Sequence, residues 1–167
     1  MKGCHLECKD DKIPVQNSKP FEPRFSSAES CVIDKEIKSL LDMNVIEELS
    51  ENVDVSDGFI STVFTRPKKN GSYRVILNLK EFNKNIVYHH FKMDTFESAL
   101  DLVTQGCYFA SVDFSNAYYS VSVAEEHRKF LRFIWKNEIY QYTCLAQGLA
   151  SAPRLFTKLL KPVFCNT

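Results

Sequence analysis

The chain has 167 residues, of which 44% are apolar and 13% are aromatic. This is enough for one compact domain with a hydrophobic core and too little for two. Twenty-one basic residues balance 21 acidic residues, so no net charge draws the whole molecule to nucleic acid or to a membrane. Any charged binding surface must therefore be local.

No run of about 18 apolar residues is present that could cross a membrane, and no apolar segment typical of a secretion signal follows Met1. We therefore expect an intracellular protein, cytoplasmic or nuclear, without a membrane partner. The six cysteines lack framework spacing, which indicates reduced thiols. Cys4, His5 and Cys8 could begin a zinc site, but no second ligand pair follows at finger-like spacing, so we interpret them as a solvated tail. Composition leaves the oligomeric state unknown.

Residues 1–26 are polar, contain three prolines and show no hydrophobic period, which is typical of an extended leader. The leader precedes one predicted domain at residues 27–167, and it can lie over that domain without belonging to its core. Within residues 28–43 the apolar side chains recur every three or four positions, which predicts an amphipathic helix. Asn44 suits the C-terminal end of this helix.

Residues 59–65 and 73–79 are rich in β-forming side chains and flank a turn with an Asn-Gly pair, which predicts a hairpin. Residues 66–84 carry six basic side chains against one acidic side chain, whereas residues 29–57 carry nine acidic and two basic ones. The sequence therefore predicts a basic hairpin beside an acidic helix.

The next segment is predicted to form a short helix and then a strand. Asp94 and Glu97 make a capping-box-like start for the helix. Residues 107–113 have the composition of a buried strand that ends at Asp113.

The last part of the chain again mixes helices and strands. We expect a short helix at residues 124–130, a hairpin formed by residues 131–135 and 139–143, and a helix that begins near Ser151 with Pro153 in its first turn. The elements do not follow a regular β-α-β order, which favours an α+β fold.

Three blocks of the sequence resemble motifs of one enzyme family. They are FTRPKKNGSYRVILNLKEFN at residues 64–83, SVDFSNAYYSVSV at residues 111–123 and LAQGLASAPRLFTK at residues 145–158. Together they are similar to the reverse transcriptases of retroviruses and long-terminal-repeat-like mobile elements. Within this family they look most similar to those of DIRS-like retrotransposons. The resemblance covers roughly residues 29–164. It implies an α+β right-hand polymerase fold, of which the chain has the fingers and the front of the palm, and a lineage of RNA-directed DNA polymerases, which are nucleotidyltransferases.

The first block is similar to the fingers hairpin that holds the triphosphate of the incoming nucleotide. A basic hairpin is most often only a solvated turn. Here Arg74 can offer a planar fork to phosphate oxygens, and a lysine at the tip can offer a point charge. The match is ambiguous by one position, so Lys68 and Lys69 both stay candidates, with Lys68 preferred.

The second block is similar to the palm strand that ends in a metal-binding aspartate. An aspartate at a strand end is commonly only a strand terminator, but the resemblance makes Asp113 a catalytic ligand of Mg²⁺ or Mn²⁺. Hard carboxylate oxygens suit the two-metal transfer of a phosphoryl group. The resemblance also places Tyr118 under the ribose 2′ position, where its ring excludes ribonucleotides. Asn116 stands where many relatives have an acidic residue.

The third block is similar to the loop and helix beneath the template and the new base pair. The resemblance places Gln147 near the nucleotide sugar, allows close backbone approach at Gly148 and puts Pro153 in the first turn of the helix. Alone, this block would be interpreted as a glycine loop that enters a helix. Ala146 replaces a proline that is frequent there.

The palm of this family also needs a Tyr-x-Asp-Asp-like hairpin, and none occurs within these 167 residues, since Asp10 and Asp11 lie in the leader. We therefore expect an incomplete metal site and no polymerisation by this chain alone. Template-primer of RNA or DNA and deoxynucleotides are the implied partners of the complete protein. The alternative is a non-catalytic remnant that binds nucleic acid or a protein partner, and a fragment that does not fold stably is a weaker option.

Overall fold

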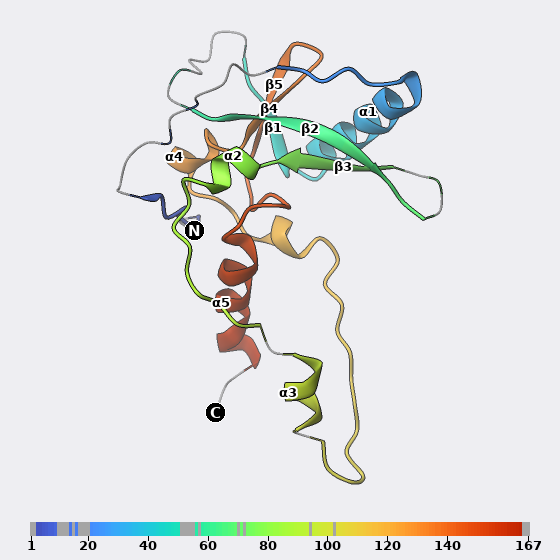
Figure 1. The fold of residues 1–167 in the computed structure, drawn as a ribbon, viewed down its shortest axis with the longest axis vertical. Coiled ribbons are helices and arrows are strands. Elements are labelled where there is room, and N and C mark those ends of the chain that lie inside the picture. The colour runs from blue at the N-terminus through green and yellow to red at the C-terminus, as the bar shows by residue number, and fades with distance from the viewer. Residues whose placement is uncertain are drawn as a thin grey trace.

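The computed structural model describes residues 3–9, 14, 16, 21–50, 56, 58–69, 71, 73–93, 95–101 and 103–164. Within these ranges the fold is α+β, as predicted (Figure 1). The strands are β1 (Ile46–Glu48), β2 (Ile60–Pro67), β3 (Tyr73–Asn78), β4 (Arg132–Trp135) and β5 (Glu138–Tyr142). The helices are α1 (Ser27–Asp42), α2 (Lys80–Asn83), α3 (Phe96–Leu100), the 3-10 helix η2 (Ala117–Ser120), α4 (Glu125–Arg128) and α5 (Ala152–Phe164). Among the described helices, none is both long and apolar enough to cross a membrane.

The five strands form one sheet in the order β1-β5-β4-β2-β3. Both predicted hairpins are confirmed, because β2 pairs antiparallel with β3 and β4 pairs antiparallel with β5. The turn of the second hairpin has positive φ at Lys136 (52°) and Asn137 (68°), as a two-residue hairpin turn requires. The parallel contact of β2 with β4 joins the two hairpins. Strand β1, which the sequence pattern did not predict, extends the sheet by pairing with β5.

Helix α1 agrees closely with the predicted helix. Ser26 caps it, because its hydroxyl accepts a hydrogen bond from the Glu29 backbone while the Glu29 carboxylate accepts one from the Ser26 backbone. Glu29 also accepts a hydrogen bond from Thr65 of β2, which ties the start of the helix to the sheet. At the other end Asn44 has a φ of 55°, as expected for a residue that follows a helix.

The core lies between the sheet, α1 and α2. Phe82 is fully buried, and its ring centroid lies 5.5 Å from that of Phe59 and 5.9 Å from that of Phe130. The leader also contributes to this core, because Leu6 is only 3% exposed. The leader therefore does more than lie over the domain. Backbone bridges from Cys4 and Cys8 hold it against the domain.

Residues 88–114, here called the arm, extend away from the sheet and return beside α5 (Figure 1). The predicted buried strand at residues 107–113 is wrong, because this segment has no strand pairing and its Tyr108, Phe109 and Val112 are exposed. Its sequence has β character, but a strand needs a neighbour for its backbone groups, and no other described segment supplies one.

The short helix predicted in the arm is present as α3, with a cap at a different residue. Thr95 accepts a hydrogen bond from the backbone of Ser98, and the Ser98 hydroxyl accepts one from the Thr95 backbone. Asp94, the predicted start, lies outside the described residues. The capping box of this helix is therefore formed by Thr95 and Ser98.

Candidate functional site

The tip of the β2–β3 hairpin gathers basic side chains in solvent. Lys68, Lys69 and Arg74 are all exposed. In the register of the hairpin Arg74 lies directly opposite Arg66, so both side chains leave the same face of the ribbon. Like charges in this position repel one another, and an anion bound between them would remove that repulsion. Positive charge therefore gathers at this tip.

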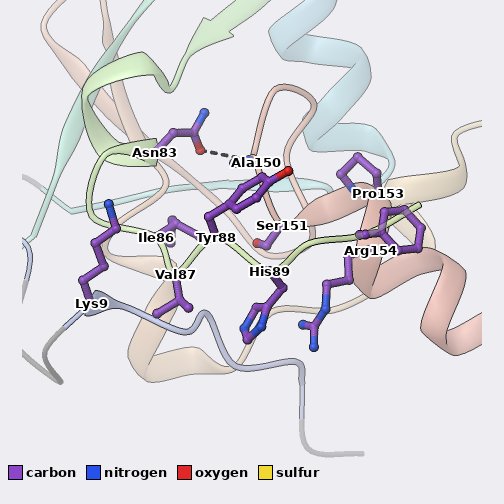
Figure 2. A pocket seen from close by; sticks show the side chains of 11 residues that line it. Lys9, Asn83, Ile86, Val87, Tyr88, His89, Ala150, Ser151, Pro153 and Arg154 are labelled. Atoms are coloured by element: carbon purple, nitrogen blue, oxygen red, sulfur yellow. Dashed lines mark hydrogen bonds between the residues drawn. The ribbon is translucent and has the colours of Figure 1, made fainter. Parts of the chain in front are cut away.

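The loop at residues 145–150 is held by a side chain that sequence reasoning did not single out. The amide of Asn83 donates to the carbonyl of Gly148 at 2.9 Å and accepts from the backbone of Ala150 at 2.9 Å, and Figure 2 shows the second bond. Gly148 has a φ of +93°, which L side chains rarely adopt. Gln147 is exposed beside this clamped glycine. The clamp fixes the backbone that presents Gln147.

The signal for Asn83 was present in the sequence, since this residue closes the first block that resembles the reverse transcriptases. A single asparagine at the end of a short helix gives no periodic pattern, and its partners lie 65 and 67 residues away in the chain. Only the tertiary fold brings the two blocks together.

Tyr118 lies on η2 and packs edge-on against Phe156 of α5, with ring centroids 5.8 Å apart. Phe114 packs edge-on against the same ring, also at 5.8 Å. Asn116, between them in the chain, has a φ of 56° and turns the backbone sharply. Pro153 stands in the first turn of α5, as predicted. These contacts fix the position of Tyr118 relative to α5.

Asp113 lies on the arm and is exposed. Its neighbour Phe114 touches α5, but Asp113 belongs to no group of three or more potential metal ligands among the described residues. A pair of Mg²⁺ ions needs more than one carboxylate to hold both ions in place. The residues that the structure describes therefore do not form a complete two-metal site.

A different group of potential ligands, His5, Glu126 and His127, lies at the leader. Cys4 and Cys8 are outside this group and half-buried, and burial raises the pKa of both thiols. Nδ1 of His127 accepts a hydrogen bond from the backbone of Leu6 at 2.7 Å. A neutral imidazole with Nδ1 as acceptor carries its proton on Nε2, so neither nitrogen of His127 is free for a metal. The histidine holds the leader instead.

The predicted site residues therefore lie in three places. Lys68, Lys69 and Arg74 form the hairpin tip. The clamped loop and the start of α5 hold Gln147, Gly148, Pro153 and, through Phe156, Tyr118. Asp113 lies on the arm. The structure brings the second and third blocks together at Phe156, but no described contact joins either block to the hairpin tip.

A sequence profile of the family described as "Reverse transcriptase (RNA-dependent DNA polymerase)" matches residues 66–167, more than half of the chain. The chain is 30% identical over 95 residues to the Pro-Pol polyprotein of simian foamy virus type 3, which covers 57% of this chain and 8% of that protein. It is 26% identical over 141 residues to the enzymatic polyprotein of cauliflower mosaic virus (strain Strasbourg), covering 84% of this chain and 20% of that protein. The chain thus spans a fifth or less of these relatives.

Solved structures have the same fold. The crystal structure of the native prototype foamy virus protease-reverse transcriptase matches with a TM-score of 0.76 and 20% identity, covering 96% of this chain and 21% of that one. The foamy viral protease-reverse transcriptase in complex with an RNA/DNA hybrid matches with a TM-score of 0.77 and 18% identity, covering 97% of this chain and 21% of that one.

Proposed function

Because the chain belongs to the reverse transcriptase family, we propose that it forms the fingers and the front of the palm of an RNA-directed DNA polymerase from a retroviral or pararetroviral element. In this proposal the complete protein binds an RNA or DNA template-primer and deoxynucleotides. The finer resemblance to DIRS-like elements stays a prediction.

The observation that carries this proposal is the basic tip of the β2–β3 hairpin. Its exposed Lys68, Lys69 and Arg74, with Arg66 opposite Arg74, gather several cations at one end of the ribbon. Arginine binds phosphate oxygens through two parallel hydrogen bonds, which suits a nucleotide triphosphate or a strand backbone. The clamped loop with Gln147 and the held ring of Tyr118 are consistent with contacts to the sugar of the same nucleotide.

The test is a titration of the purified chain with a labelled primer-template at low and at moderate salt. We expect weak binding that falls steeply with salt, and an Arg74→Ala variant that binds about three- to tenfold more weakly and with a shallower salt dependence. Lys38→Ala is the control, because Lys38 is exposed on α1 and its loss removes one positive charge elsewhere. Equal affinity of wild type and Arg74→Ala at both salts would contradict the proposal.

The same titration decides between the two lysines. Lys68→Ala and Lys69→Ala remove the same charge from neighbouring positions at the tip. If Lys68 is the phosphate contact, as we propose, its loss weakens binding more than the loss of Lys69. The reverse order would assign the contact to Lys69.

Reverse transcriptases generally use divalent metal ions, and in the complete protein Asp113 would be one carboxylate ligand of Mg²⁺ or Mn²⁺. Because one exposed carboxylate cannot fix two ions, we propose that this chain alone does not polymerise. Primer extension on an RNA template with either ion tests this, with Asp113→Ala as the comparison. Extension by the wild type and none by Asp113→Ala would overturn it. A module that only binds nucleic acid would likewise bind without extension in both variants.

A further inference from the structure

The leader places the carboxylate of Glu7 between basic side chains from two other segments. Its Oε2 contacts Nε2 of His89 in the arm, and its Oε1 lies 3.7 Å from Nη1 of Arg154 on α5. Lys158, one helical turn after Arg154, also acts on Glu7 by its charge. Each oxygen of one carboxylate therefore faces a different basic side chain.

The cluster formed by His89 and Arg154 lines a pocket of about 220 Å³. Figure 2 shows His89 and Arg154 lying side by side at the pocket, with Ser151 deeper and close to the start of α5. The Ser151 hydroxyl is buried and has no hydrogen-bond partner in the part of the chain that the structure describes. The adjoining helix end carries the partial positive charge of its free N–H groups. The pocket thus offers donors and positive charge, which suit an anion.

The side chains of His89 and Arg154 are more deeply set than the carboxylate. The side chain of Arg154 is 25% exposed and that of His89 is 35% exposed, whereas that of Glu7 is 52% exposed. Glu7 therefore reaches the cluster from the solvent side, where another anion would arrive.

The leader backbone is held independently of this carboxylate. The backbone of Val87 donates to the carbonyl of Glu7 at 2.9 Å, and the backbone of Lys9 donates to the carbonyl of Asn85 at 2.8 Å. The Glu7 side chain can therefore turn away while the leader backbone stays in place. Displacement of one exposed carboxylate needs a rotamer change and no unfolding.

We propose that the cluster of His89 and Arg154 binds a phosphate group of a nucleic-acid strand, and that the Glu7 carboxylate is an internal competitor for this site. The inference rests on the proposed function, because it takes the ligand to be the strand that the chain binds. A phosphodiester has two free oxygens, so it can replace both contacts of the carboxylate. The hydrogen bond from His89 lowers the pKa of Glu7, with Arg154 and Lys158 lowering it further against partial burial, so the competitor is charged at neutral pH.

The experiment measures binding of a short fluorescent DNA single strand to the full chain at low salt. The variants are Glu7→Gln, Arg154→Gln and the double variant. Glu36→Gln, at an exposed position of α1, is a control that removes the same negative charge elsewhere. We expect Glu7→Gln to bind about three- to tenfold more tightly than wild type, because a competing charge worth up to about one unit of log affinity is gone. Glu36→Gln should bind like wild type.

The double variant identifies the site. Arg154→Gln should weaken binding more in the Glu7→Gln background than in the wild-type background, because only the freed arginine can hold the phosphate. This difference is independent of any loosening of the leader, and hydrogen exchange of the Val87 amide reports whether the leader stays bound. Equal effects of Arg154→Gln in both backgrounds, or an equal gain from Glu36→Gln, would overturn the inference.

The outcome also separates the two proposals. If Arg74→Ala weakens binding while Glu7→Gln changes nothing, only the competition by Glu7 is wrong. If neither wild type nor Glu7→Gln binds the strand at low salt, the proposed function fails as well. Competition with inorganic phosphate distinguishes two kinds of site. It displaces the strand fully from a site that recognises the phosphate group alone, and only partly from a site that also needs the rest of the strand.

Discussion

The sheet region and the arm are both rich in aromatic and β-branched residues, yet only the sheet region buries them. Phe82 in the sheet region is 0% exposed, whereas Tyr108 and Phe109 in the arm are 101% and 77% exposed. The difference lies in the partners. Each strand of the two hairpins finds its first neighbour within a few residues of chain, while residues 107–113 have no strand pairing among the described segments. A β-rich composition predicts a strand, but the strand forms only where a partner backbone pairs with its N–H and C=O groups.

The comparison predicts that truncations in the two regions have very different effects. Phe82→Ala should lower the free energy of unfolding by about 3–5 kcal/mol, because it opens a cavity between Phe59 and Phe130. Tyr88→Ala, at an 81% exposed site in the arm, should change it by less than about 0.5 kcal/mol. Urea denaturation followed by circular dichroism measures both. Similar losses for the two variants would mean that the arm is packed in solution.

A second prediction concerns the junction of α1 with the sheet. Ser26→Ala removes the hydroxyl that caps α1, and it should lower the free energy of unfolding by about 1 kcal/mol. Ser39→Ala is the matched control, since Ser39 is exposed within α1 and alanine favours a helix interior slightly. The same denaturation series provides the measurement. A loss at Ser39 as large as that at Ser26 would exclude the cap as its cause.

A third prediction concerns the leader, in which Leu6 is buried like the core residues of the sheet region. Burial lowers the pKa of His127 below its ordinary value of 6.5, His5 and Lys129 lower it further, and Glu126 opposes them. The folded state thus favours the neutral ring, which accepts the bond from Leu6. This contribution is complete above pH 6.5 and is lost as the pH falls through the lower folded pKa.

Hydrogen exchange tests this pH dependence. The protection factor of the Leu6 amide should fall as the pH is lowered from 7 to 5. The Leu131 amide donates to the carbonyl of Arg128, and its protection factor should stay constant over this range. A His127→Gln variant should lose the pH dependence. If the Leu6 protection factor stays constant over this range, the ring does not control the leader.

Much of the fold was predictable from the sequence because its signals are local. The period of α1, the two hairpins and the proline at the start of α5 each depend on residues within one short segment. The errors and omissions are non-local. Leu6 is buried by contacts with residues far along the chain, β1 is only three residues long, and the strand predicted at residues 107–113 lacks its partner.

The candidate site divides in the same way. The resemblance selected Arg74, Gln147 and Gly148, which lie within local motifs. It did not select Asn83 as the clamp, because the function of this amide depends on a loop more than 60 residues away. The contacts of Glu7 could not be predicted from the sequence for the same reason. They join Glu7 to His89 and Arg154, and they exist only after the leader has packed against the domain.

The last prediction concerns residues 107–113 of the arm, and it distinguishes an exposed segment from a buried strand. Tyr108→Ser, Phe109→Ser and Val112→Thr together should change the free energy of unfolding by less than about 1 kcal/mol, because little area is buried at these sites. The same variant should reduce self-association, since an unpaired segment with exposed apolar side chains is a template for pairing with another chain. Sedimentation velocity over a range of concentrations measures the association, and Lys92→Ser, an exposed polar change in the same arm, is its control. A monodisperse wild-type monomer would show that the exposed arm does not promote association. A large loss of stability in the triple variant would show instead that residues 107–113 are packed in solution, and that the strand predicted from their composition forms after all.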